Sequence, residues 1–143
     1  MIRYKKIRRH SFSKVGRLAA TVKQIKEIDA LYLFGSAAAK KISPLSDLDL
    51  AVLLNKKVPA EKYLDFRLTL IDRFAKILAT SEIDLVLLNQ APPLLAYEVI
   101  RSGKILFERN RGERIDYECK VLSFYFDMQP FYQFHRNSLK QRL

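Results

Sequence analysis

Three short apolar runs, separated by stretches whose apolar residues recur every three or four positions, constrain the fold of this chain most strongly. The runs are Leu31–Phe34, Asp47–Leu54 and Glu82–Leu88. Apolar runs of this length, bounded by polar or turn-forming residues, are typical of buried β-strands. Strands that alternate with helices pack into a sheet covered by those helices. The sequence therefore predicts an α/β (α+β) fold, with a small mixed sheet of three to four strands.

The connection between the first two runs favours a mixed sheet over a purely parallel one. Ten residues separate the pair Gly35-Ser36 at the end of the first run from Asp47 at the start of the second. A crossover between parallel strands needs a dozen residues or more. A further short strand at Ile105–Phe107 is expected at an edge of the sheet.

Four stretches have the spacing of amphipathic helices. Their apolar residues are Val15, Leu18, Val22 and Ile25; Leu64, Leu68, Ile71, Ala75 and Leu78; Leu95, Val99 and Ile100; and Ile115, Leu122, Tyr125 and Phe126. Pro92-Pro93 opens the third helix and Gly103 lies where its cap belongs. Because proline removes a helix hydrogen bond, Pro130 is expected to interrupt the last helix, predicted from about Glu113 to Asp127.

The net charge of +11 is concentrated at one end of the chain. Residues 1–26 hold nine Lys or Arg and no acid, whereas the remaining 117 residues hold 17 basic and 15 acidic groups. A basic arm at 1–12 can attract RNA, polyphosphates or an acidic protein partner. A solvated terminus explains it equally well, so binding of nucleic acid through the arm is an open alternative that we do not favour.

The length fits one domain, and the low cysteine content fits a reducing compartment. The 143 residues fit a single domain spanning 1–143, with the basic arm at 1–12 and an aromatic and basic tail at 129–143. No apolar stretch approaches the ~20 residues that cross a bilayer, and no apolar run follows the basic start as in a signal peptide. The single cysteine, Cys119, allows no intrachain disulfide and is expected to be buried. We expect a cytoplasmic protein without a membrane partner.

Two aspartates, Asp47 and Asp49, stand at the start of the second apolar run. Residues two apart on a strand point to the same face, so these carboxylates project together. Carboxylates side by side raise each other's pKa unless a positive charge lies between them. A divalent cation bound by oxygen ligands, Mg²⁺ or Mn²⁺, meets that need, although turn-forming aspartates produce the same pattern.

Asp84 in the third run strengthens the metal hypothesis. Apolar neighbours flank it, and no basic residue is close to it in sequence. If the second and third strands are neighbours, Asp84 converges on the point where Asp47 and Asp49 lie. Three converging carboxylates can hold two metal ions of the kind used in phosphoryl transfer.

Gly35 and Ser36 supply the other half of the predicted site. A strand that ends in glycine and turns into a helix brings backbone N–H groups close to an anion, and Ser36 adds a hydroxyl donor. Alone, Gly-Ser is also an ordinary turn. The pair lies directly after a strand and ten residues before the aspartates. This position favours a role in the site over that of an ordinary turn.

This combination of strand, Gly-Ser, Asp-x-Asp and a later strand aspartate resembles the nucleotidyltransferase superfamily that includes DNA polymerase β. The resemblance implies that Gly35 and Ser36 hold a nucleoside triphosphate. It implies that Asp47, Asp49 and Asp84 bind two Mg²⁺ ions and are the catalytic residues. The chain departs from the family pattern at Ala37, where a bulky or basic residue is common, and at Lys40, where a glycine is common.

The stretch from Ser81 to Arg109, "SEIDLVLLNQAPPLLAYEVIRSGKILFER", looks like the minimal MNT-type nucleotidyltransferases that are paired with HEPN-family ribonuclease toxins. The likeness covers about Leu31 to Asp127. It implies an antitoxin that uses ATP as its substrate and transfers AMP to a tyrosine of its HEPN toxin. Transfer to a small molecule or to an RNA end is a second hypothesis. Neutralisation of the toxin by binding alone is a third.

An aromatic cluster follows Pro130. Phe131, Tyr132 and Phe134 either cover the domain's own core or dock a partner. The charged stretch that follows leaves the cluster at an edge, which favours docking.

Overall fold

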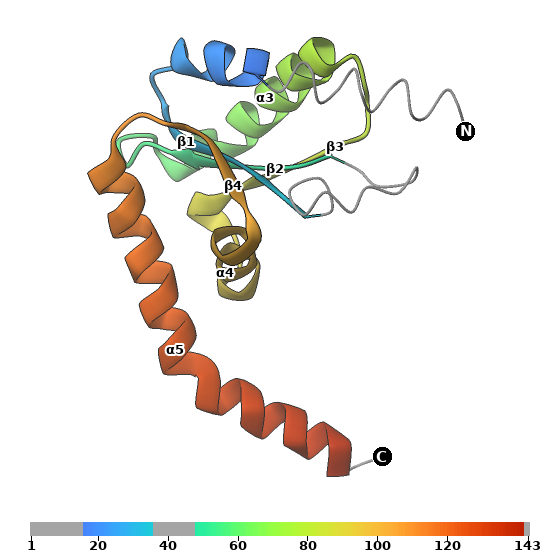
Figure 1. Ribbon diagram of the computed structural model, residues 1–143, viewed down its shortest axis with the longest axis vertical. Helices are drawn as coiled ribbons and strands as arrows, with labels where there is room; N and C mark the ends of the chain where they lie inside the picture. The colour runs from blue at the N-terminus through green and yellow to red at the C-terminus, as the bar shows by residue number, and fades with distance from the viewer. Residues whose placement is uncertain (1–15, 36–47, 142–143) are drawn as a thin grey trace.

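A four-stranded mixed sheet forms the centre of the protein, as the sequence predicts. The computed structural model describes residues 16–35 and 48–141. The strands are β1 (Ile28–Phe34), β2 (Leu48–Leu54), β3 (Ile83–Leu87) and β4 (Lys104–Glu108), in the order β3-β2-β1-β4 (Figure 1). The central strand β1 pairs antiparallel with β2 and β4, and β2 pairs parallel with β3.

Helices cover both faces of the sheet (Figure 1). A helix over residues 16–23 and α3 (Tyr63–Leu78) pack on one face, and a single 3-10 turn, η1 (Ala60–Lys62), precedes α3. On the other face lie α4 (Pro93–Ser102), which follows the turn η2 (Leu88–Gln90), and the long α5 (Arg111–Gln141). No helix in the described part of the chain is both long enough and apolar enough to span a bilayer.

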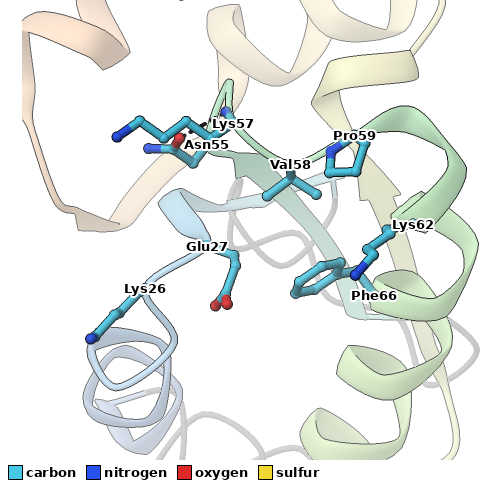
Figure 2. Close-up of a pocket in the computed structure, with 8 residues that line it drawn as sticks. All are labelled: Lys26, Glu27, Asn55, Lys57, Val58, Pro59, Lys62 and Phe66. Carbon is cyan, nitrogen blue, oxygen red and sulfur yellow. Dashed lines mark hydrogen bonds between the residues drawn. The ribbon is translucent and has the colours of Figure 1, made fainter.

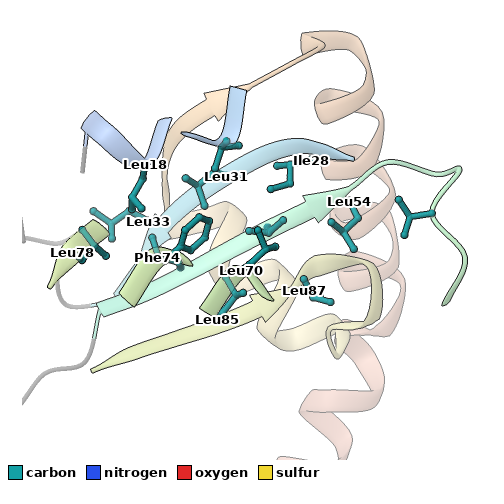
Figure 3. Packing of buried hydrophobic residues seen from close by; sticks show 14 residues of the cluster. Leu18, Ile28, Leu31, Leu33, Leu54, Leu70, Phe74, Leu78, Leu85 and Leu87 are labelled. Carbon is teal, nitrogen blue, oxygen red and sulfur yellow. The ribbon is translucent and has the colours of Figure 1, made fainter. Parts of the chain in front are cut away.

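The two faces of the sheet hold separate apolar clusters, because successive strand residues point to opposite faces. Leu31 and Leu33 of β1 contact the cluster under α3, which contains Leu70, Phe74 and Leu78 (Figure 3). The alternate β1 residues Ala30, Tyr32 and Phe34 belong to the smaller cluster under α4. The same alternation decides to which face each polar residue of a strand points.

The buried face of α3 differs from the stripe expected from its sequence. Leu78 is buried as expected, but Leu64 and Leu68 are exposed, and Leu70 and Phe74 are buried in their place. Two sets of residues in this helix keep three- and four-residue spacing. The set with Phe74 is the one that packs against the sheet, so tertiary packing decides between the two sets.

The last helix does not end at Pro130, so that expectation is wrong. α5 continues through Pro130 to Gln141 and bends along its length (Figure 1). Proline removes the hydrogen bond to the carbonyl of Phe126, which lies four residues earlier. Because Pro130 and Phe126 are exposed, water can solvate that carbonyl. Cys119, expected to be buried, is exposed on the same helix, and α5 has no buried residue.

A polar network fixes the first turns of α5 on the sheet. The Tyr32 hydroxyl donates a hydrogen bond to Glu118 (2.7 Å), and Arg114 forms ion pairs with Glu118 (2.9 Å) and with Glu108 (2.5 Å). Burial, followed by the neighbouring Glu118, raises the pKa of Tyr32, which therefore stays a neutral donor. Hydrogen bonds from Arg114 and Arg111 lower the pKa of Glu108.

Arg109, directly after β4, holds the helix of residues 16–23 against the sheet. Its guanidinium donates to the carbonyl oxygens of Ile28 (2.9 Å), Ile25 (2.9 Å), and Val22 and Lys23 (3.2 Å each). Val22 and Lys23 lie at the C-terminal end of the helix, where carbonyls lack helical partners. The oxygens of Val22 and Ile25 also accept the backbone N–H groups of Ile25 (2.9 Å) and Ile28 (3.1 Å). One side chain thus caps the helix and joins it to the strand.

Substitution of Arg109 by alanine should lower the free energy of unfolding by about 2 kcal/mol, because hydrogen bonds from a charged donor are lost. Arg109→Lys should recover little, since one ammonium group cannot reach all four carbonyls. Urea unfolding measures both effects. The matched control is Arg101→Ala, which removes only an exposed ion pair with Glu98 and should leave the unfolding midpoint unchanged. Equal midpoints for the Arg109 and Arg101 variants would contradict the capping role.

Candidate active site

Asp49 and Asp84 lie side by side on neighbouring strands. In the parallel pairing of β2 with β3, Asp49 is the register partner of Asp84. Neighbouring strands lie about 4.8 Å apart, and register partners point to the same face of the sheet. Asp84 is exposed and Asp49 half-buried. The register therefore brings together two of the three predicted carboxylates.

Both carboxylates are on the face of the sheet that α4 and α5 cover. Ala51 and Leu53, the alternate residues after Asp49 on β2, belong to the cluster under α4, and Val86, two residues after Asp84, packs against it. The residues between them, such as Leu50 and Leu85, belong to the cluster under α3. The acidic pair therefore emerges where β2 and β3 begin, beside a helix-covered apolar layer.

Gly35 makes room for the Asp49 carboxylate. Its backbone has a φ of +73°, and a Cβ atom added to it would lie 2.2 Å from the Oδ2 atom of Asp49. The preceding residue, Phe34, is the register partner of Asp49 across β1 and β2. The end of β1 and the start of β2 are thus in direct contact, and only glycine fits both the conformation and the space.

The remaining predicted site residues, Asp47 and Ser36, lie outside the described residues, as do Ala37 and Lys40. Within residues 16–35 and 48–141 no three His, Cys, Asp or Glu side chains gather into a metal site. Asp49 and Asp84 are two ligands of the type that Mg²⁺ takes, with oxygen donors only. Neighbouring carboxylates of this kind suit a divalent cation, because a positive charge relieves their mutual repulsion.

Phe34 is a neighbour of the site that sequence reasoning missed. It is buried and is the register partner of Asp49 on the neighbouring strand. No spacing within the sequence reveals this contact. Register between antiparallel strands is set by the turn and by packing, neither of which a single segment shows.

A pocket of the described residues lies at the opposite end of β2. It has a volume of about 490 Å³ and lies between the start of β1 and the residues that follow β2. Its lysines do not converge: Figure 2 shows the side chains of Lys26 and Lys57 directed away from Phe66, and Glu27 between these groups. This pocket is separate from the acidic pair and has no constellation of reactive groups.

A protein-family comparison identifies the class of site. The model of the family described as polymerase beta nucleotidyltransferase matches residues 17–112, which is more than half of the chain and includes Gly35, Asp49 and Asp84. This chain belongs to that nucleotidyltransferase family. The resemblance inferred from Gly-Ser and the strand aspartates is therefore confirmed at the level of the family.

Two solved structures of toxin–antitoxin complexes share the fold of this nucleotidyltransferase. A chain of a toxin–antitoxin structure with AMP-PNP has a TM-score of 0.71 and 24% identity, covering 89% of this chain and 98% of that one. A chain of the MntA–HepT toxin–antitoxin structure gives 0.67 and 23%, with 89% and 97% covered.

A third match comes from tri-AMPylated Shewanella oneidensis HEPN toxin in complex with MNT antitoxin. Its TM-score is 0.68 and its identity 23%, over 91% of this chain and 98% of the other. At these identities the likeness shows a shared fold. None of the curated proteins compared with this chain matches it.

Substitution of Gly35 by alanine tests the contact between the ends of β1 and β2. We expect a loss of about 1–2 kcal/mol of unfolding free energy from the strained backbone. We expect the rate of nucleotidyl transfer to fall by a larger fraction than the stability, because the new methyl group displaces the Asp49 carboxylate. Urea unfolding and a transfer assay measure the two effects.

Gly16→Ala is the matched control. A Cβ atom there has no neighbour within 4 Å, and Gly16 lies in a helix, so alanine should raise stability by up to about 1 kcal/mol and leave transfer unchanged. A Gly35→Ala protein with wild-type stability and transfer would show that Gly35 is only a turn residue.

Proposed function

We propose that this nucleotidyltransferase is an antitoxin that transfers AMP from ATP to a tyrosine of a HEPN-family ribonuclease toxin and so neutralises it. The observation that carries the proposal is the lateral pairing of Asp49 with Asp84, directly against the Gly35 turn. That pairing supports a Mg²⁺-dependent site at which a triphosphate meets an acceptor.

The proposed site residues divide into two groups. Gly35 and Ser36 hold the triphosphate of ATP, Gly35 by allowing close approach of the backbone and Ser36 by its hydroxyl. Asp47, Asp49 and Asp84 are the proposed metal ligands and catalytic residues. Two Mg²⁺ ions bound there would neutralise the phosphate charge and lower the pKa of the attacking hydroxyl.

The proposed reaction is an in-line displacement at the α-phosphorus of ATP. A bond forms between the tyrosine oxygen and the α-phosphorus, and the bond from that phosphorus to the bridging oxygen breaks. Pyrophosphate leaves with the electron pair, and the phenolic proton passes to solvent. The residues of the chain hold the reactants in line, which is the main contribution of a protein to phosphoryl transfer.

The matched structures support the proposed partner and nucleotide. One contains AMP-PNP, an analogue of ATP, and another contains a tri-AMPylated HEPN toxin together with an MNT antitoxin. The fold is shared over about nine-tenths of this chain. A toxin as acceptor agrees with these structures better than an RNA end or a small molecule.

Substitution of Asp84 by asparagine should abolish AMP transfer, because one amide oxygen replaces a charged ligand at a site that depends on negative charge. Asp84 is exposed, so the variant should fold with an unchanged unfolding midpoint. The assay incubates purified variant, HEPN toxin and Mg²⁺ with α-labelled ATP and follows label on the toxin. Asp47→Asn is expected to behave in the same way.

The control is Asp72→Asn, a substitution at another exposed aspartate, which is paired with Lys76 (3.0 Å) on α3. It should transfer AMP at the wild-type rate. Parallel reactions with RNA and with an aminoglycoside in place of the toxin separate the alternative acceptors. Unchanged transfer by the Asp47→Asn/Asp84→Asn double variant would refute the proposed site. Neutralisation of the toxin by that variant without transfer would mean that binding alone suffices.

A further inference from the structure

One side of α5 packs against the rest of the domain in the first half of the helix and has few contacts in the second half. In the first half, Tyr117 donates a hydrogen bond to the carbonyl oxygen of Leu88 (3.1 Å). Farther along, Tyr125 stacks on Tyr97 of α4, with ring centroids 3.6 Å apart and planes within 2°. These residues, with Val121 between them, recur every four positions and so form one side of the helix.

The same side of α5 continues past the body of the protein as a partly exposed apolar surface, on which Met128 and Tyr132 are half-buried. Met128, Phe131, Tyr132 and Leu139 extend the three- and four-residue spacing of the packed half, and we define these four residues as the distal apolar face. Phe131 is 65% exposed and Leu139 49% exposed. Figure 1 shows this half of α5 extending beyond α4, away from the sheet.

The charge beside the distal apolar face is mainly positive, with the exposed Asp127 at its start. From Met128 to Gln141 the helix contains Arg136 and Lys140 and no acidic residue. By helical spacing these two cations lie beside the apolar residues, at the border of the face. A complementary surface is therefore an apolar groove bordered by carboxylates, since apolar burial supplies affinity and the charged rim supplies steering.

We infer that the distal apolar face of α5 docks the HEPN toxin through such a groove, an inference that rests on the proposed function. α5 and the acidic pair Asp49 and Asp84 occupy the same face of the sheet. A toxin held on α5 therefore stands on the side to which the carboxylates point. Docking raises the local concentration of the acceptor tyrosine at the site.

The test compares two substituted proteins with the full-length wild type. Phe131→Ala/Leu139→Ala removes two exposed side chains of the distal apolar face. Phe126→Ala is the matched control, because Phe126 is also exposed, at 62%, and lies about 140° around the helix from both residues. Neither variant touches the acidic pair. Isothermal titration with the HEPN toxin gives Kd, and AMP transfer at varied toxin concentration gives kcat and KM.

We expect Phe131→Ala/Leu139→Ala to raise Kd and KM for the toxin by at least about tenfold while kcat stays within about twofold, because only docking is lost. Phe126→Ala should match the wild type. Asp84→Asn should show the opposite pattern, with wild-type Kd for the toxin and no transfer. This contrast separates the docking surface from the active site.

Three results would overturn the inference. One is wild-type Kd and KM in Phe131→Ala/Leu139→Ala. The second is a loss of self-association in that variant, by light scattering, with no change in toxin affinity, which would assign the face to a second copy of the chain. The third is binding to phosphatidylserine-containing vesicles that depends on the face while toxin binding does not. If the wild-type protein neither binds nor modifies the toxin, the proposed function fails first, and that outcome is distinct from all three.

Discussion

The parallel pairing of β2 with β3 is the interaction on which the site depends, since it sets Asp49 beside Asp84. A shift of this register by one residue would turn one carboxylate to the opposite face of the sheet. The pairing is held by the apolar residues between the acidic ones, such as Leu50 and Leu85, which are buried under α3. Burial on one face thus fixes the position of charge on the other.

The two faces of the sheet differ in how they are covered. The face under α3 is closed by large apolar side chains, and Arg109 anchors the helix of residues 16–23 there. The other face carries the acidic pair, α4 and the long α5. The second half of α5 extends beyond the rest of the domain, and no residue of α5 is fully buried. In the proposed function, chemistry and partner binding share this second face, so that a docked toxin meets the nucleotide.

The parts of this account that the sequence predicts are those set by local periodicity. Strand alternation predicts that Asp84 and Asp49 share a face once β2 and β3 are neighbours, and the short connection after Gly35 predicts a mixed sheet. Packing decides the rest. The buried set of α3 that includes Phe74, the continuation of α5 through Pro130 and the exposure of Cys119 depend on which surfaces meet, and no single segment contains that information.

The most direct test of the central claim is the location of metal ions when ATP is bound. Crystals of the protein grown with AMP-PNP and Mn²⁺ would give anomalous scattering peaks at the metal positions. The account predicts peaks within coordination distance of the Asp49 and Asp84 carboxylates, about 2.1 Å from their oxygens, with the triphosphate beside Gly35. Metal and nucleotide bound elsewhere, with these two carboxylates uncoordinated, would contradict it.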